Sequence, residues 1–133
     1  MYHKISLIGR VGRDPENKTI KSGMQLSSFS IAVDIHGKTN DQKVTIWPKI
    51  TVFDSAAEFV REYVKKGDLV LVEGRLSPDP VTGGPKVFQK KNGIYGSSYE
   101  IIGEKVQLLS SKNRQQNDWE LLSDVKVPDD IPF

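Results

Sequence analysis

Polar and apolar positions alternate along most of the chain, and this two-residue period is typical of strands with one buried face. In residues 25–33, for example, Phe29, Ile31 and Val33 are each separated by a polar or small residue. β-Branched and aromatic side chains dominate residues 44–53 and favour a strand there. The pattern predicts strands at residues 3–7, 25–33, 44–53, 69–76 and 98–109.

One segment changes period and predicts a helix. Apolar residues at positions 56, 57, 59, 60, 63 and 64 recur at three- and four-residue spacing. Asp54 or Ser55 can cap the N-terminus, and residues 65–67 (Lys-Lys-Gly) supply positive charge and a glycine where helices commonly end. We therefore expect one helix of about three turns between the third and fourth strands.

The remaining segments are predicted to connect these elements. Residues 14–17 and 21–23 have the composition of turns, and residues 77–96, rich in Pro, Gly and Lys, are interpreted as a long loop. Five strands with one helix between the third and fourth is the order of the OB-fold, a Greek-key barrel that binds oligonucleotides and oligosaccharides. The sequence therefore predicts an all-β, five-stranded OB-fold barrel with a single helix.

The pattern stops near residue 111, and the charge changes sign soon afterwards. Residues 1–112 carry 17 Lys and Arg against 12 Asp and Glu, whereas residues 113–133 carry two basic and five acidic side chains. We interpret residues 1–110 as the folded domain and residues 111–133 as a flexible, short linker with an acidic end. A basic body suits a polyanion, although a mildly basic domain with a solvating tail has the same composition.

Composition excludes several classes of protein. The 133 residues include no cysteine, which excludes disulfides, thiolate metal sites and thiol catalysis. No apolar run approaches the roughly 18 residues that a membrane-spanning helix needs. The first residues lack the long apolar run of a signal peptide, so we expect a cytoplasmic protein.

Motifs for catalysis and metal binding are weak. Residues 32–39 resemble a relaxed phosphate-binding loop, but Ala32 replaces the first glycine and no helix follows Thr39 before the next strand. His3 and His36 are isolated in the sequence and do not suggest a metal site or a catalytic dyad. We therefore predict no catalytic residue, no metal and no cofactor.

Aromatic and basic residues are interleaved in two regions. Trp47 precedes Lys49 and Phe53, and residues 86–95 add further lysines and rings. Unpaired bases stack on aromatic rings while Lys and Arg contact phosphates, so this composition indicates single-stranded nucleic acid. Trp47 has the opposite parity to Ile46 and Ile50 and is expected to face outward, whereas the barrel core remains an alternative for Phe53. The candidate contacts are Trp47, Lys49, Phe53, Lys86, Phe88, Lys90, Lys91 and Tyr95.

The last five residues form a separate candidate site. Asp129 and Asp130 precede Ile131, Pro132 and Phe133, so a proline-stiffened apolar plug follows two negative charges. Such a plug suits an apolar pocket with basic residues on another protein. The alternative is an acidic tail that only solvates the chain.

Together these features resemble the bacterial single-stranded DNA-binding protein (SSB) family, over residues 3–110 and at the C-terminal end. The resemblance is carried by KISLIGRVGRDPE at 4–16, WPKITVF at 47–53, YVKKG at 63–67, VEGRL at 72–76 and DDIPF at 129–133. It implies a homotetramer that wraps and protects single-stranded DNA in the cytoplasm, associated with the nucleoid. It also implies that residues 129–133 recruit replication, recombination and repair proteins.

The resemblance also implies roles for individual residues. Trp47 and Phe53 match the family's stacking aromatics, and Lys4, Lys49 and Lys66 match basic positions that contact the DNA backbone.

Two departures from the family concern the DNA path and the linker. Many members have a further tryptophan after the second strand and another after the fourth, where this chain has residues 34–37 and 78–81. Phe88 and Tyr95 are the nearest substitutes for these tryptophans. The linker, residues 111–126, is shorter than in many members.

An interaction adaptor similar to OB-fold primosome proteins, with weak DNA binding, is the alternative function. An enzyme that uses residues 37–39 is the least favoured.

Overall fold

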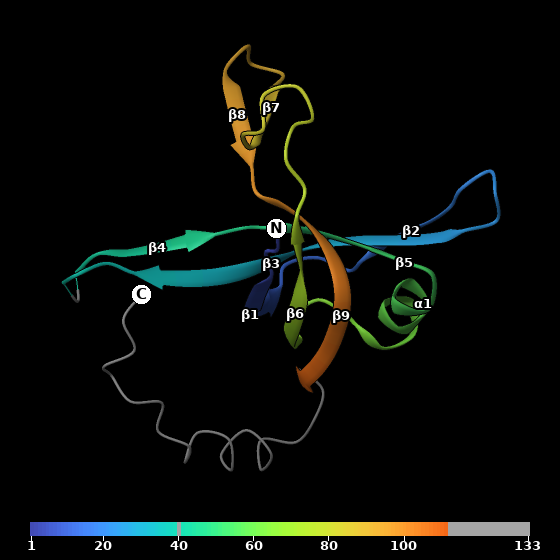
Figure 1. Cartoon of the computed structure of the whole chain (residues 1–133). Helices are drawn as coiled ribbons and strands as arrows, with labels where there is room; N and C mark the ends of the chain where they lie inside the picture. Colours follow the sequence, from blue (N-terminus) through green and yellow to red (C-terminus); the bar gives the residue numbers. More distant parts are fainter. Residues whose placement is uncertain (40, 112–133) are drawn as a thin grey trace.

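The structure, a computed structural model, describes residues 1–39 and 41–111 (Figure 1). Its elements are β1 (Ile5–Val11), β2 (Glu16–Thr19), β3 (Gln25–His36), β4 (Lys43–Ile46), β5 (Lys49–Phe53), α1 (Asp54–Tyr63), β6 (Leu69–Leu76), β7 (Lys86–Gln89), β8 (Tyr95–Ser98) and β9 (Glu100–Ser110). The predicted tail, residues 111–133, lies outside the described residues except for Ser111. Its predicted flexibility and tip therefore stay predictions.

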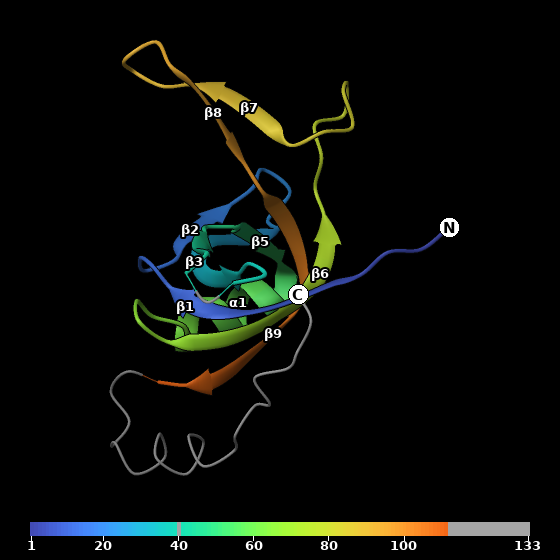
Figure 2. The same cartoon turned by 90° about the vertical axis from the view of Figure 1, so that its left-hand side faces the viewer.

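Five of the strands close into a ring. β1 pairs with β6, β6 with β9, β9 with β5 and β5 with β3, and β3 returns to β1. All these pairs are antiparallel except β5–β9, which is parallel. Figure 2 looks along the ring, with α1 at its far end. A closed five-stranded barrel with α1 between its third and fourth strands confirms the predicted OB-fold.

β-Branched side chains fill most of the barrel interior. They are stiff at χ1 and pack well on a pleated sheet, which suits a small closed core. Inward and outward positions alternate along the strands, as the period of the sequence predicted. The buried apolar residues are Val11, Phe29, Ile31, Ile50, Val52, Ala57, Val60, Val64, Val70, Val72 and Ile101.

The predicted strand at residues 44–53 is interrupted at Trp47 and Pro48. β4 and β5 both pair with β3, but neither includes these two residues. Pro48 has no backbone N–H to donate, although its carbonyl oxygen accepts a hydrogen bond from Ile31 N–H at 3.2 Å. The prediction of one continuous strand is therefore wrong, and the break sets Trp47 between two strands.

Two segments predicted as a turn and a loop contain strands instead. β2 begins inside the predicted turn at 14–17 and pairs with β3 from Glu16↔Ser28 to Thr19↔Gln25. β7 and the first part of β8 lie within the predicted loop at 77–96, where they form a hairpin. All β2 residues and most β7 residues are exposed. Because neither strand buries one face, neither shows the alternation by which strands are found in a sequence.

The ends of α1 also differ from the prediction. Its N-cap residue is Phe53, and no side-chain hydrogen bond caps the described N-terminus. Asp54 is the first helical residue and places a favourable negative charge in the first turn. Gly67 lies beyond the extended Val64 in a left-handed conformation (φ +90°), and its N–H donates to the Val11 carbonyl oxygen at 2.8 Å. Gly67 thus joins the segment after α1 to β1 and does not end the helix.

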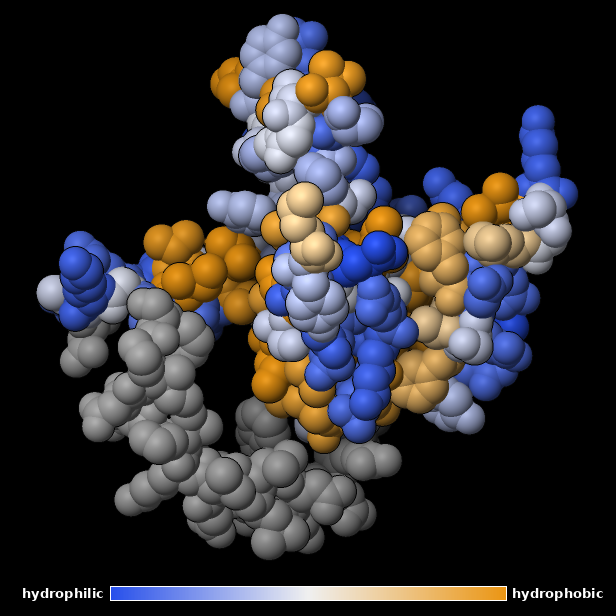
Figure 3. All heavy atoms as spheres, in the orientation of Figure 1, coloured by the Kyte–Doolittle hydropathy of each residue, from blue (hydrophilic) through white to orange (hydrophobic). Residues whose placement is uncertain are grey.

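Two hairpins project from the barrel (Figure 1). The β3–β4 arm (residues 33–46) carries Val33, Ile35, Val44 and Ile46 on one face and polar side chains on the other. Figure 3 shows apolar side chains gathered over this arm, where Ile35 and Val44 are exposed. The β7–β8 arm (residues 77–99) leaves the barrel after β6 and returns to it at β9.

Candidate functional site

Trp47 lies on the outside of the barrel, where the chain passes from β4 to β5. The residue is 56% exposed. Its ring covers Gly12, because a Cβ built at Gly12 would lie only 2.7 Å from Trp47 Cζ3. The indole is therefore held against the backbone that follows β1, while more than half of the residue stays accessible.

A cavity of about 510 Å³ lies beside this ring. It places an aromatic surface next to a guanidinium, an ammonium, two hydroxyl groups and two carboxylates. The ring and the two cations suit a stacked base with its phosphate. The structure thus places two of the candidate residues, Trp47 and Lys49, in the lining of one cavity. The cavity is lined by Gly12, Arg13, Asp14, Glu16, Ser28, Phe29, Ser30, Trp47 and Lys49.

Arg13 is a cavity residue that the sequence prediction missed. It stands directly after Gly12, on the segment that leaves β1 and leads into β2. An arginine contacts a phosphate through a planar fork of donors, which a lysine does not have. No signal in the sequence marked Arg13, because the contact of its neighbour Gly12 with Trp47 is formed only in the folded chain.

Phe53 faces outward and does not belong to the barrel core. Along β5, Lys49, Thr51 and Phe53 share the outer face, whereas Ile50 and Val52 are fully buried. Phe53 is half-buried opposite Leu26 of β3. Its ring therefore lies on the same face of the strand as Lys49.

The β7–β8 arm separates the candidate residues of the predicted loop onto two faces. Phe88 is paired with Gly96, and a Cβ built at Gly96 would lie 3.0 Å from both Phe88 Cζ and Lys90 Cε. Lys86, two residues before Phe88, shares this face. Tyr95 is paired with Gln89 and lies on the opposite face. The structure therefore joins the candidates Lys86, Phe88 and Lys90 but not Tyr95, and exposed Lys91 lies in the turn of the arm.

An ion-paired carboxylate joins the arm to the barrel. Glu100 Oε2 lies 3.0 Å from Lys86 Nζ, and Glu100 Oε1 lies 4.0 Å from Lys49 Nζ. Lys49 also lines the Trp47 cavity. One carboxylate is therefore the acidic partner of both Lys49 in the barrel and Lys86 in the arm.

The other two candidate lysines lie in different surroundings. Lys4 Nζ is 3.0 Å from Glu73 Oε2, and hydrogen bonding to this carboxylate raises the pKa of Lys4. Lys4 lines a second cavity that shares no residue with the Trp47 cavity. Lys66 is exposed, and its backbone N–H donates to Asp14 Oδ1 at 2.8 Å, which places it beside the Trp47 cavity. The structure thus brings Lys66, but not Lys4, to the candidate site.

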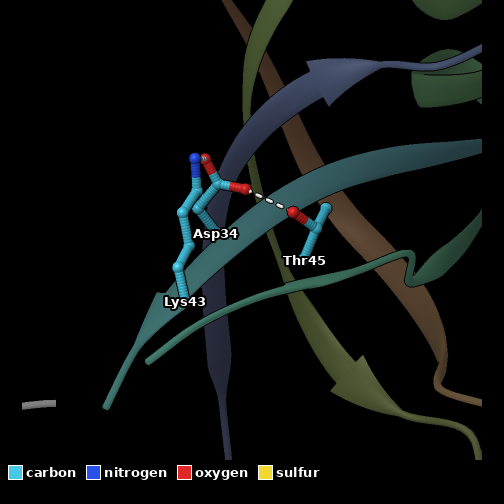
Figure 4. A network of polar contacts seen from close by, with 3 residues as sticks. All are labelled: Asp34, Lys43 and Thr45. Atoms are coloured by element: carbon cyan, nitrogen blue, oxygen red, sulfur yellow. Dashed lines mark hydrogen bonds and ion pairs between the residues drawn. The ribbon is translucent and has the colours of Figure 1, made fainter. Parts of the chain in front are cut away.

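A polar cluster holds the β3–β4 arm (Figure 4). The Thr45 hydroxyl donates to Asp34 Oδ1 at 2.7 Å, and Lys43 Nζ lies 3.2 Å from Asp34 Oδ2. The hydrogen bond from Thr45 and the one from Lys43 lower the pKa of Asp34. These contacts join β3 to β4 across the Asp34↔Thr45 pair, just before Trp47.

Other kinds of site are not found in the described part of the chain. Among residues 1–39 and 41–111, no group of three or more His, Asp or Glu side chains is placed to hold a metal ion. The helix among the described residues, α1, has ten residues and is too short to cross a membrane.

Residues 2–109 match the single-strand binding protein family. The chain belongs to this family. Similar proteins include the single-stranded DNA-binding protein of Thermotoga maritima, 45% identical over 114 residues that cover 84% of this chain and 76% of that protein. The single-stranded DNA-binding protein of Neisseria meningitidis serogroup A is 35% identical over 84% of this chain. Single-stranded DNA-binding protein 1 of Staphylococcus aureus MSSA476 is 31% identical over 91% of this chain and 74% of its own length.

The family match begins before β1, includes both arms and ends at residue 109, one residue before the end of β9. Membership of this family identifies the matched region as a binding domain and not an enzyme. The aligned part of this chain spans 62% of the length of the Neisseria relative. Residues 129–133, the predicted partner-binding tip (Asp129, Asp130, Ile131, Pro132 and Phe133), lie outside both the family match and the described residues.

Proposed function

We propose that this protein binds and protects single-stranded DNA without marked sequence preference. The observation that carries the proposal is the exposed Trp47 ring, fixed over Gly12 and flanked by Arg13 and Lys49 in one cavity. A stacked base contacts a ring whatever its identity, and cations beside the ring contact any phosphate, so such a site tolerates many sequences. The names of the similar proteins support this proposal.

The proposed path of the strand follows from the placement of the basic and aromatic residues. It runs from the Trp47 cavity over the outer face of β5 and onto the Phe88 face of the β7–β8 arm. Lys4 and Tyr95, which lie elsewhere, stay predictions from the sequence. The proposed contacts are Arg13, Trp47, Lys49, Phe53, Lys66, Lys86, Phe88, Lys90 and Lys91.

Fluorescence titration of Trp47 with oligo-dT tests the proposal. The chain has a second tryptophan, Trp119, so a Trp119→Phe variant isolates the Trp47 signal. Quenching by oligo-dT, with an affinity that falls as salt rises, is expected because stacking alters the indole and phosphate contacts release counterions. A duplex of equal length serves as the control. No binding of oligo-dT by the folded chain would favour the alternative adaptor function.

A homotetramer is the second part of the proposal. Ile8 on the outer face of β1 is 54% exposed and is paired with Leu71 of β6. Of the two edges of β1, one is paired with β6 along most of its length, whereas β3 pairs only with Arg10 and Val11. An exposed apolar side chain on a strand with an open edge suits contact with a second copy of the chain. Light scattering of wild type and Ile8→Lys tests this, with a smaller assembly expected for the variant.

Recruitment of replication, recombination and repair proteins by residues 129–133 is the third part. This proposal rests on the sequence alone, since two acids precede an apolar plug that DNA does not need. In pull-downs from a bacterial lysate, Phe133→Ala is expected to lose most captured partners, whereas the variant keeps both aspartates. Its affinity for oligo-dT should equal that of wild type. Normal capture by Phe133→Ala would show that any recruitment depends on charge alone.

A further inference from the structure

Glu100 lies at the junction between the barrel and the β7–β8 arm. It is the first residue of β9 and is paired with Lys49 in the parallel β5–β9 ladder. Its carbonyl oxygen accepts a hydrogen bond from Ser77 N–H at 2.8 Å, just after β6 ends. Both ends of the arm therefore join the barrel beside this residue, one after β6 and the other before β9. Figure 2 shows the arm leaving the barrel at β6 and returning at β9.

The Glu100 carboxylate is held between two lysines that are more exposed than itself. Its side chain is 18% exposed, whereas those of Lys49 and Lys86 are 51% and 42% exposed. The 3.0 Å pair with Lys86 links the arm to the barrel, and the 4.0 Å pair with Lys49 reaches the Trp47 cavity. A largely covered carboxylate is screened less by water and salt than one on an open surface.

The same two ammonium groups are proposed contacts of the DNA backbone. A carboxylate and a phosphate are both anions and take the same donors. DNA that passes from Trp47 to Phe88 must therefore displace the Glu100 carboxylate from Lys49 and Lys86, or lie beside its negative charge. We propose that Glu100 is an intramolecular competitor of the DNA phosphates, which limits the affinity of the site and its dependence on salt. This inference rests on the proposed function and adds a residue that regulates it.

The first test compares Glu100→Gln with Glu104→Gln, a control that removes the same charge from β9. Glu104 pairs with Arg75 at 2.8 Å and does not line the Trp47 cavity. In titrations of labelled oligo-dT, Glu100→Gln should bind about two- to fivefold tighter than Glu104→Gln at low salt, which is the scale of a partly exposed ion pair. Its plot of log affinity against log salt should be steeper, because the freed lysines take phosphates fully.

The outcomes separate this inference from the function on which it rests. Equal affinities and equal salt slopes for Glu100→Gln and Glu104→Gln would overturn the competitor role, while wild-type binding would leave the proposed function standing. A wild-type chain that does not bind oligo-dT would overturn the proposed function itself. Thermal unfolding of each variant shows that the titrated protein is folded.

A second test substitutes the two lysines of the Phe88 face in two backgrounds, the wild-type chain and Glu100→Gln. Lys86 pairs with Glu100 at 3.0 Å, whereas Lys90 makes no ion pair with another described residue. The change in oligo-dT affinity caused by Lys86→Gln should therefore differ between the two backgrounds, whereas the change caused by Lys90→Gln should be the same in both. An effect of Lys86→Gln that is the same in both backgrounds would overturn the inference.

Discussion

Phe88 and Tyr95 lie on opposite faces of the β7–β8 ribbon. Phe88 is paired with Gly96 and Tyr95 with Gln89, so neighbouring pairs point their side chains in opposite directions. Only the Phe88 face carries Lys86, whose carboxylate partner Glu100 also contacts the barrel lysine Lys49. The proposed path of single-stranded DNA along this ribbon therefore includes Phe88 and not Tyr95.

The first prediction compares these two aromatic residues. Phe88→Ala should weaken binding of an oligo-dT long enough to reach the arm by about 1–3 kcal/mol, the usual effect of removing one stacking ring. Tyr95→Ala should cost clearly less, because Tyr95 lies on the face of the ribbon opposite to Lys86 and Lys90. Fluorescence anisotropy with the two variants makes the comparison. A greater loss for Tyr95→Ala would place the strand on the other face of the arm.

The second prediction concerns Trp47. Trp47→Ala should lose about 1–3 kcal/mol of binding to short oligo-dT. Its melting temperature should change little, because the residue is 56% exposed and makes no part of the buried core. Titration and thermal unfolding of the same preparation separate the two effects. Unchanged affinity of a destabilised variant would make Trp47 a structural residue.

The third prediction uses the glycine beneath Trp47. In Gly12→Ala the new methyl group would lie 2.7 Å from Trp47 Cζ3, so the indole must move. We expect weaker binding of oligo-dT and a shifted Trp47 emission spectrum in a chain that also carries Trp119→Phe. Gly84→Ala is the matched control, since its Cβ would have no neighbour closer than the Thr82 hydroxyl at 3.6 Å. Identical affinities of the two variants would show that the ring position is unimportant.

The fourth prediction concerns the acid dependence of the β3–β4 arm. The pKa of Asp34 is lowered from 3.8, first by the hydrogen bond from Thr45 and then by the one from Lys43. A carboxyl whose pKa is lower in the folded state stabilises it at pH values above the unfolded pKa, and this contribution is lost as pH falls through the folded pKa. Thr45→Val should therefore raise the pKa of Asp34 toward 3.8.

Carboxyl NMR of wild type and Thr45→Val over about pH 2 to 6 measures this change. Thr19→Val, on the different strand pair β2–β3, serves as the control and should leave the titration of Asp34 as in wild type. Titration of Asp34 at the same pH in Thr45→Val and wild type would mean that the Thr45 hydroxyl does not stabilise the carboxylate.

The fifth prediction concerns a buried hydroxyl. Ser27 is 1% exposed, and its Oγ lies 3.2 Å from the Ala57 carbonyl oxygen of α1 and also contacts the Asn17 side chain of β2. Ser27→Ala should reduce the free energy of unfolding by about 1–3 kcal/mol, because buried polar partners lose their hydrogen bond. Urea denaturation measures the loss, with exposed Ser97→Ala as the control. Equal stability of the two variants would contradict this role.

The closed barrel was predictable because burial imposes a period on the sequence. Strands that fill the core carry apolar residues at every second position, as Ile50 and Val52 do in β5. In α1 the apolar residues recur at spacings of three and four. The order of these periods determined the OB-fold class before any tertiary contact was known. β2 and β7 escaped prediction because both faces of each strand meet solvent and no period results.

The kind of ligand was predictable from residue types, but the arrangement of the site was not. Trp47 among lysines indicates stacked bases and phosphates wherever the residues lie. Tertiary structure alone decided that Gly12 lies against Trp47 and that Arg13 lines the same cavity. It also decided that Phe88 and Tyr95 lie on opposite faces of the ribbon and that Glu100 lies between two lysines. The physical reason is that such contacts depend on strand register and chain crossing, which join residues far apart in the sequence, whereas periodicity reports only the local environment of each strand.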